Sequence, residues 1–294
     1  MVSSGDGLQE DLAAACAAAG ADPGRVAVSC WRWARSIRNA LPLPAGSRAQ
    51  IGGSRTIYPA SVSKLFFLFA AQAALEEGRL APTPELLRAL EDAITVSGND
   101  ATHLIVDALT GTSGGLELPG AEMQQWLESR QALNRYFHSL GWAEFEGITI
   151  AHKTYAEGPY GREKIARGPN GEHGNRLTTE AVARLVFEIA TGGAVTPQRS
   201  RAMLELMARD PRGHSDDPQD QVRGFFGEGL PEGAKLWSKA GWTSQTRHDA
   251  AYVELPEGPS FILVAFTTGP EMARNMAFLP ELARRICAAA VRGG

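Results

Sequence analysis

Ser61 and Lys64 lie three residues apart in the segment YPASVSK, residues 58–64. A helix predicted from Ser61 to Glu77 puts both side chains on one face, and its N-terminus favours developing negative charge. A serine hydroxyl becomes a nucleophile when a base sits beside it, and a neutral lysine amine can serve as that base. Burial and a second cation would lower the pKa of the lysine and so favour its neutral form. The pair predicts acyl transfer through Ser61, although a serine and a lysine on an exposed helix face are more often solvated.

Two further short motifs join the Ser61–Lys64 pair to make a set of three. Ser97-Gly98-Asn99 precedes a helix predicted over 100–109, and Lys239-Ala240-Gly241 lies on a predicted strand. The chain contains one SxxK, one SxN and one KxG pattern, in the order and contexts typical of serine acyl-transfer enzymes.

These three segments resemble the serine β-lactamase and penicillin-binding-protein superfamily, and class A β-lactamases most closely. The segment RLTT at 176–179 and the strand pattern over 249–268 are similar to that family as well. The resemblance covers nearly all of the chain beyond residue 25.

The resemblance implies a role for each residue of the set. Ser61 attacks the carbonyl and becomes acylated, and Lys64 takes or relays its proton. Ser97 passes a proton to the departing nitrogen, while Asn99 positions the lysine and the substrate amide. Lys239 helps to hold a substrate carboxylate.

Backbone and substrate-binding groups follow from the same resemblance. The N–H groups of Ser61 and Trp242 would form the oxyanion hole, in which one donor is typically worth about 3 kcal/mol. Gly241, Trp242 and Arg247 would line the substrate site. Arg247 can equally be an exposed arginine at the end of a strand.

The chain departs from the family pattern at two places. Ala240 stands where a threonine or serine usually contacts a substrate carboxylate. The Glu-x-x-Leu-Asn segment, which activates the deacylating water in class A enzymes, is missing. Glu163 is nearest to the expected position and is the candidate deacylation base, although a loop glutamate is usually a solvated charge.

Three functions remain open. The first is a β-lactamase-like serine hydrolase that cleaves a lactam, amide or ester through acyl-Ser61. The second is an acyltransferase or DD-peptidase-type enzyme, which the missing glutamate segment favours. The third is a non-catalytic binding or sensor domain, against which the retained set of Ser61, Lys64 and Ser97 argues.

The elements that must position this set predict an α+β fold. Strands are predicted near both ends of the chain and helices between them, so we expect one antiparallel sheet flanked by N- and C-terminal helices, with an inserted all-helical lobe. The expected boundaries are 1–55 with 215–294 for the α/β lobe and 56–214 for the helical lobe. Residues 151–176 are rich in glycine and predict a long irregular loop.

Composition narrows the class of partner. A net charge of −4 gives no general attraction to nucleic acid, so no nucleic-acid partner is expected. The resemblance implies a small-molecule substrate, namely a lactam, amide or ester that carries a carboxylate. Cys16, Cys30 and Cys287 show no metal-type spacing and are expected to be buried thiols. No metal or other cofactor is expected.

The longest apolar stretch, residues 65–75, is too short to cross a bilayer, so no transmembrane segment is expected. No export signal is visible near the start. A cytoplasmic location is therefore expected, or a periplasmic or secreted one if a leader has been removed.

Overall fold

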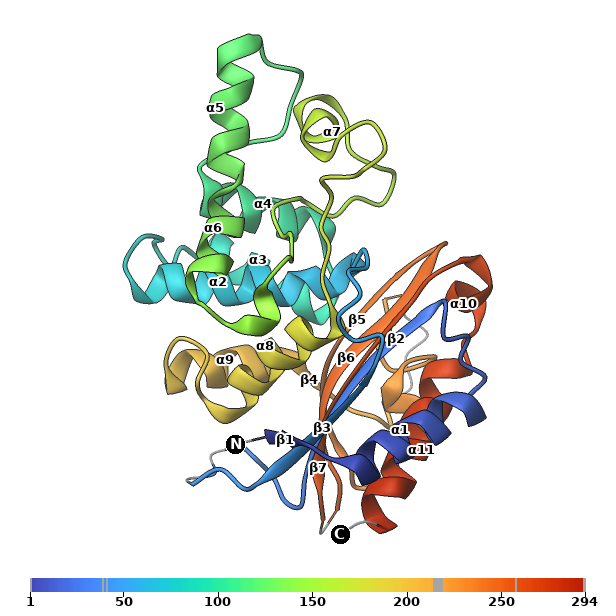
Figure 1. Ribbon diagram of the computed structural model, residues 1–294. Helices are drawn as coiled ribbons and strands as arrows, with labels where there is room; N and C mark the ends of the chain where they lie inside the picture. The colour runs from blue at the N-terminus through green and yellow to red at the C-terminus, as the bar shows by residue number, and fades with distance from the viewer. Residues whose placement is uncertain (1, 39, 41, 214–218, 257, 293–294) are drawn as a thin grey trace. The chain divides into compact units, whose positions relative to one another are not determined.

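The computed structural model describes residues 2–38, 40, 42–213, 219–256 and 258–292 (Figure 1). The chain forms two compact units. The sheet unit comprises Met1–Val62 and Thr178–Gly294, and the helical unit comprises Ser63–Leu177. The α+β class predicted from the sequence is confirmed.

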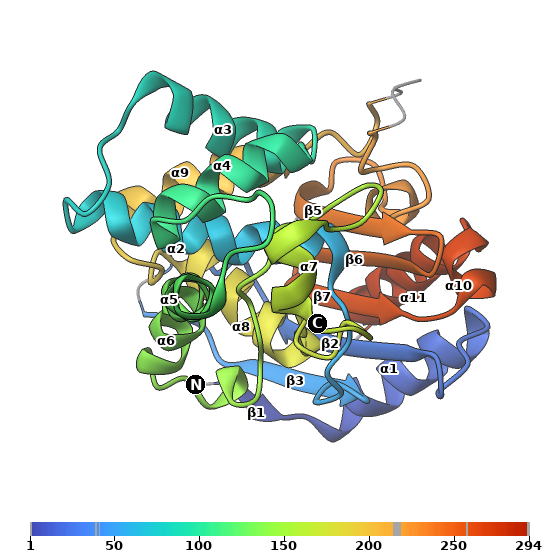
Figure 2. The ribbon, with the colours of Figure 1, turned by 90° about the horizontal axis from the view of Figure 1, so that it is seen from above.

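One seven-stranded sheet organises the sheet unit, in the order β1-β3-β2-β7-β6-β5-β4. β1 and β3 are parallel, and every other described pair is antiparallel. Seen from above, the strands follow one another in this order from β5 to β3 (Figure 2). The strands are β1 (Val2–Ser4), β2 (Val26–Trp33), β3 (Gly46–Ile51), β4 (Ala208–Arg209), β5 (Lys235–Thr243), β6 (Thr246–Glu254) and β7 (Ser260–Thr267).

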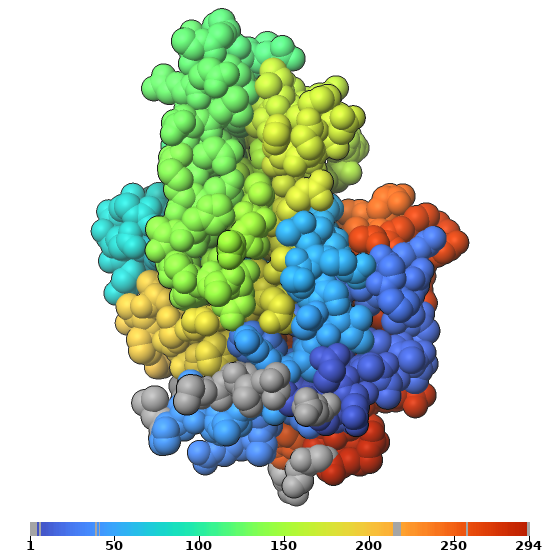
Figure 3. All heavy atoms as spheres, in the orientation of Figure 1, coloured from blue at the N-terminus to red at the C-terminus, as the bar shows by residue number. Residues whose placement is uncertain are grey.

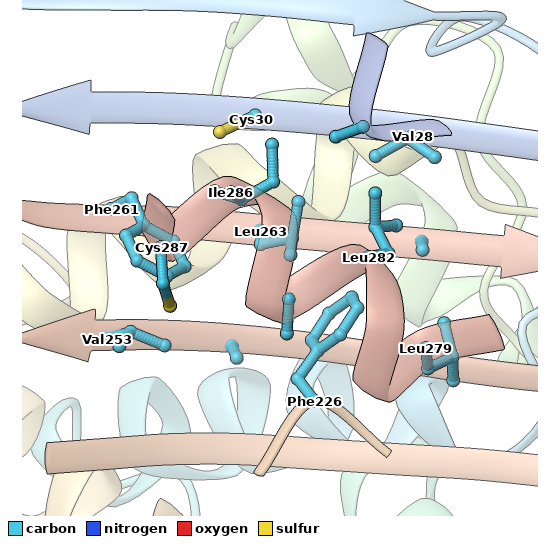
Figure 4. Packing of buried hydrophobic residues seen from close by; sticks show 14 of the residues in the cluster. Val28, Cys30, Phe226, Val253, Phe261, Leu263, Leu279, Leu282, Ile286 and Cys287 are labelled. Carbon is cyan, nitrogen blue, oxygen red and sulfur yellow. The ribbon is translucent and has the colours of Figure 1, made fainter. Parts of the chain in front are cut away.

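Helices cover both faces of this sheet (Figure 1). On one face, Leu282 and Ile286 pack with strand residues such as Leu263 in one apolar core (Figure 4). On the other face, Phe187 lies 5.7 Å from the rings of both Trp31 and Trp33. The helical elements of the unit are α1 (Asp6–Ala18), α8 (Thr179–Thr191), α9 (Pro197–Met207), η3 (Phe226–Gly229), α10 (Pro270–Arg274) and α11 (Phe278–Arg292).

The unit boundaries differ from those expected at 55/56 and 214/215. Sequence composition groups α8 and α9 with the other helices, but α8 packs on β2, β6 and β7 and α9 packs on β5. Packing of Phe187 against the two tryptophans of β2 places α8 with the sheet unit. Helical content alone therefore does not reveal which helices cover a sheet.

The helical unit is built around α2, which is buried on all sides as its run of apolar residues predicts. The ring of Phe66 lies 5.1 Å from that of Phe137 and 5.4 Å from that of Phe145. The elements are α2 (Lys64–Glu76), α3 (Pro84–Thr95), α4 (Asn99–Thr110), α5 (Gly120–Arg130), α6 (Ala132–Ser139), η2 (Ala143–Phe145) and α7 (Gly161–Arg167); η1 (Ala60–Ser63) leads directly into α2.

The segment 151–176 is not irregular throughout, because it contains the helix α7. Its ends are paired by the bridge between Thr149 and Arg176. Ala166 of α7 packs with Met123 and Trp126 of α5, and the two segments touch in the space-filling view (Figure 3). Tertiary packing on α5 therefore orders a stretch that its glycines mark as a loop.

Within the described residues, no helix combines the length and the apolar character that crossing a membrane requires.

Candidate active site

Lys64 is the first residue of α2, and its side chain is 1% exposed. Its Nζ donates to Asn99 Oδ1 at 2.9 Å, to Ser97 Oγ at 3.3 Å and to the Ser97 carbonyl. No described carboxylate forms an ion pair with it. Burial therefore lowers the pKa of Lys64 to about 7, so a large fraction of its amine is neutral near neutral pH.

Ser97 and Asn99 are brought to this amine by the start of α4. Gly98 is the N-cap of the helix and Asn99 is its first residue. Ser97 has a φ of 58°, in the left-handed region that non-glycine residues rarely adopt. Ala60, directly before Ser61, has a φ of 46°. Backbone strain of this kind clusters at functional sites, and here it coincides with two segments of the predicted set.

Ser61 lies in η1 against β5 of the same unit. A Cβ added at Gly241 would lie 2.8 Å from Ser61 N and 3.0 Å from Val62 N. Both contacts are with backbone atoms, so only glycine allows the strand to approach the Ser61 amide this closely. The approach accounts for the glycine of the Lys239-Ala240-Gly241 motif.

Lys239 is fully buried on β5. Its Nζ donates to Gln221 Oε1 at 2.7 Å and to the Ala240 carbonyl at 2.7 Å. Gln221 Oε1 also accepts from Ala240 N at 3.2 Å. Gln221 thus holds the side chain of Lys239 and the backbone of Ala240 in place. No sequence pattern singled out Gln221.

Trp242 and Arg247 are held by a shared neighbour. The Trp242 ring lies 5.5 Å from that of Phe225, and the Arg247 guanidinium lies 4.7 Å from the Phe225 ring centroid. Arg247 Nε also donates to the Ala273 carbonyl at 3.1 Å. The guanidinium therefore has a packing role, and its contact with a substrate stays a prediction.

His248 is a second residue that the sequence did not single out. The Thr267 N–H donates to His248 Nδ1 at 3.0 Å, so Nδ1 carries no proton, and Nε2–H donates to the Tyr58 carbonyl at 2.9 Å. Burial lowers the pKa of His248 to about 4. A neutral imidazole of one fixed tautomer therefore anchors the segment that carries Ser61 to the sheet.

Glu163 lies within the helical unit in a buried cluster of charges. Its Oε1 is 2.6 Å from Arg130 Nη2 and 3.5 Å from Lys153 Nζ, and Asp107 bonds the same two cations at 3.3 and 2.6 Å. Glu163 is 1% exposed and Arg130 is fully buried. The carboxylate thus fastens α7 to the C-terminal end of α5, which is a structural task.

The variant Glu163→Gln tests whether Glu163 has this structural role. Removing one partner of a buried ion pair typically costs about 3 kcal/mol, because a charge is left uncompensated. We expect a clear fall in the melting temperature, with the matched variant Glu157→Gln, at an exposed loop position, melting like the wild type. An unchanged melting temperature together with a trapped acyl-enzyme would instead make Glu163 a deacylation base.

The sequence profile of the beta-lactamase enzyme family matches residues 81–290. The chain belongs to this family. The matched region contains Ser97, Asn99 and Lys239 and begins after Ser61 and Lys64. No curated protein sequence matches the chain.

Solved structures of beta-lactamases and of PBP-A share the fold. A beta-lactamase from Sphaerobacter thermophilus is 20% identical, with 97% of each chain covered and a TM-score of 0.65. A beta-lactamase from Chitinophaga pinensis is 16% identical, with 99% of this chain and all of the other covered and a TM-score of 0.64. A mutant of PBP-A, solved as an acyl-enzyme complex with penicillin G, is 19% identical, with 97% of each chain covered and a TM-score of 0.66.

Proposed function

We propose that this protein is a serine hydrolase of β-lactamase type that cleaves a lactam, amide or ester through an acyl-Ser61 intermediate. The observation that carries the proposal is the state of Lys64. Its amine is buried, has a pKa lowered to about 7 and is bonded to Ser97 and Asn99. A buried structural lysine would normally have a carboxylate partner, whereas a neutral amine three residues after a serine is suited to proton transfer.

The proposed acylation moves one proton in a closed path. Ser61 Oγ attacks the substrate carbonyl while its proton passes to Lys64 Nζ. The oxyanion is stabilised by the N–H groups of Ser61 and Trp242. The carbonyl carbon then loses its nitrogen or oxygen leaving group, which takes the proton from Lys64 through Ser97 Oγ. Lys64 is neutral again, and Ser61 is an ester.

Hydrolysis of that ester requires a base for the attacking water. Neutral Lys64 is the proposed base, because the described contacts of Glu163 lie with Arg130 and Lys153. The proton that water loses to Lys64 returns to Ser61 Oγ as the acid product leaves. Lys239 supplies a positive charge for a substrate carboxylate.

A second function is favoured by the same contacts of Glu163. With that carboxylate tied to two cations, water attack on acyl-Ser61 can be slow, and an amine can accept the acyl group instead. An acyltransferase or DD-peptidase-type enzyme would behave in this way.

Incubation with nitrocefin and a fluorescent penicillin, with hydrolysis and intact mass followed together, tests the proposal. We expect a covalent adduct at Ser61 and sustained turnover, both lost in Ser61→Ala. Ser244→Ala is the matched control, because Ser244 is exposed in the turn between β5 and β6, and it should behave as the wild type.

The other outcomes separate the alternatives. A stable Ser61 adduct that is released by D-alanine or glycine, with a transfer product, favours the acyltransferase. If neither the penicillin nor a fluorophosphonate probe labels Ser61, the enzyme proposal is wrong and a binding or sensor role replaces it.

A further inference from the structure

A cavity of about 740 Å³ lies within the sheet unit, on the face of the sheet that α8 and α9 cover (Figure 1). Small-molecule binding sites have volumes of roughly 300–1,000 Å³, so this cavity is large enough to hold a ligand. None of the described residues in its wall belongs to the set predicted around Ser61. A ligand of this cavity would therefore be distinct from the substrate of Ser61.

Two aromatic rings form much of the apolar wall, and other side chains hold both of them in place. Phe187 stacks on a tryptophan of β2, with ring centroids 5.7 Å apart, and Trp237 stacks on Tyr252 at 5.4 Å. The Arg38 guanidinium lies 4.6 Å from the centre of the Trp237 ring, and Glu254 accepts two hydrogen bonds of 3.3 Å from it. The apolar wall is thus already formed and favours a ligand with an aromatic body.

Two charged side chains of the wall differ from the others. Glu188, for example, pairs with Arg184 at 2.8 Å. In contrast, the side chains of Arg201 and Glu205 form no hydrogen bond and no ion pair with any residue that the structure describes. They are exposed and lie one turn apart on α9, with the arginine first, which is the less favourable order for a pair within one helix. Both charges are therefore available to a ligand.

The ends of two helices add partial charges of both signs to the same wall. α8 ends at Thr191 and α9 begins at Pro197, and both residues line the cavity. The C-terminal end of a helix favours a cation, and the N-terminal end favours an anion. A ligand that carries both signs of charge beside an apolar body is therefore complementary to this wall.

We propose that this cavity binds a free α-amino acid with an aromatic side chain. Arg201 bonds its carboxylate, Glu205 bonds its ammonium group, and its ring packs on the wall formed by Phe187 and Trp237. An amino acid carries both charges on one carbon, and residues one helical turn apart have Cβ atoms only about 6 Å apart, so both flexible side chains can reach it. An anion without the ammonium group would meet Glu205 as a like charge.

Isothermal titration calorimetry with three probes that share an indole ring tests the proposal. L-Tryptophan carries both charges, tryptamine lacks the carboxylate, and indole-3-propionate lacks the ammonium group. We expect the wild type to bind L-tryptophan with a Kd below about 1 mM. The two other probes should bind about fivefold more weakly, which is the upper end for an exposed ion pair. L-Alanine, which has the same charges without the ring, should give no measurable binding.

Two variants assign the charges. Arg201→Gln should weaken the binding of L-tryptophan and indole-3-propionate about fivefold without weakening that of tryptamine. Glu205→Gln should weaken the binding of L-tryptophan and tryptamine without weakening that of indole-3-propionate. Both side chains are exposed, so both variants should fold. The matched controls Arg292→Gln and Glu10→Gln, at exposed positions of α11 and α1, should bind all three probes as the wild type does.

Three results would overturn the proposal. The first is a wild type that binds L-tryptophan no better than L-alanine. The second is binding of L-tryptophan that neither variant weakens, because the ligand is then held elsewhere. The third is a variant that weakens all three probes equally, because its side chain then does not recognise one charge. None of the probes contains a bond that Ser61 is proposed to cleave, so the outcome is independent of the proposed hydrolase activity.

Discussion

Gly241→Ala should lower the rate of Ser61 acylation by about 100- to 1,000-fold, the loss typical of one oxyanion-hole donor. The added Cβ would lie 2.8 Å from Ser61 N and 3.1 Å from the Pro59 carbonyl. Neither atom can move away at low cost, because His248 holds the Tyr58 carbonyl and Val62 is fully buried. The variant thus displaces the amide that would stabilise the oxyanion.

Stopped-flow acylation by nitrocefin measures this effect, with thermal melting as the fold check. Gly7→Ala is the matched control, because a Cβ at Gly7 meets nothing within 4 Å; its acylation rate should equal that of the wild type. If Gly241→Ala acylates within threefold of the wild-type rate, the Ser61 amide does not serve in the oxyanion hole.

Lys64→Met should lower kcat/KM by about 1,000-fold or more, since positioned proton transfer contributes 100- to 10,000-fold. Lys64→Arg should be as inactive, because a guanidinium keeps its proton at every accessible pH. An arginine that retained activity would mean that position 64 needs only a positive charge. Lys164→Met, at an exposed position of α7, is the control and should keep wild-type activity.

The pH profile follows from the same residue. The lowered pKa of Lys64, about 7, means that its amine is increasingly protonated below pH 7 and neutral above it. Activity should therefore fall about tenfold per pH unit below pH 7 and level off above it. A profile that is flat between pH 5 and 8 would remove Lys64 from proton transfer.

The stability of Lys64→Met separates loss of chemistry from loss of fold. A lysine whose folded pKa lies below its unfolded value of 10.5 binds its proton less tightly in the native state. Its contribution to stability is therefore unfavourable at pH 7 and diminishes as the pH rises towards 10.5. Methionine removes that cost, so we expect the inactive variant to melt no lower than the wild type at pH 7.

The local sequence pattern was sufficient to predict much of the fold. The apolar run 65–69 marked α2 as a buried helix, and strand patterns at both ends of the chain marked a sheet assembled from distant segments. Residues 120–139 form two helices, α5 and α6, which meet at Gln131. Gln131, the residue at the junction, keeps helical backbone angles. The break therefore needs no glycine or proline, and none marks it in the sequence.

Contacts between residues that lie far apart in the chain could not be predicted from the sequence. α7 forms because Glu163 pairs with Arg130 and Ala166 packs on α5, and neither partner lies within 30 residues along the chain. His248 and Gln221 each act through two hydrogen bonds to residues that are distant in the chain. Such bonds have no periodicity, so a lone histidine or glutamine in the sequence does not indicate them.

The three cysteines give the protein an internal reporter. Cys16, Cys30 and Cys287 are reduced and lie together in the core between α1, α11 and the sheet, and burial raises the pKa of each thiol to about 12. A thiol in this state reacts with a disulfide reagent only when the core opens. All three belong to the sheet unit and the helical unit has none. The rate of thiol modification in the native protein therefore measures how fast the sheet unit alone opens. No reporter group has to be introduced for this measurement.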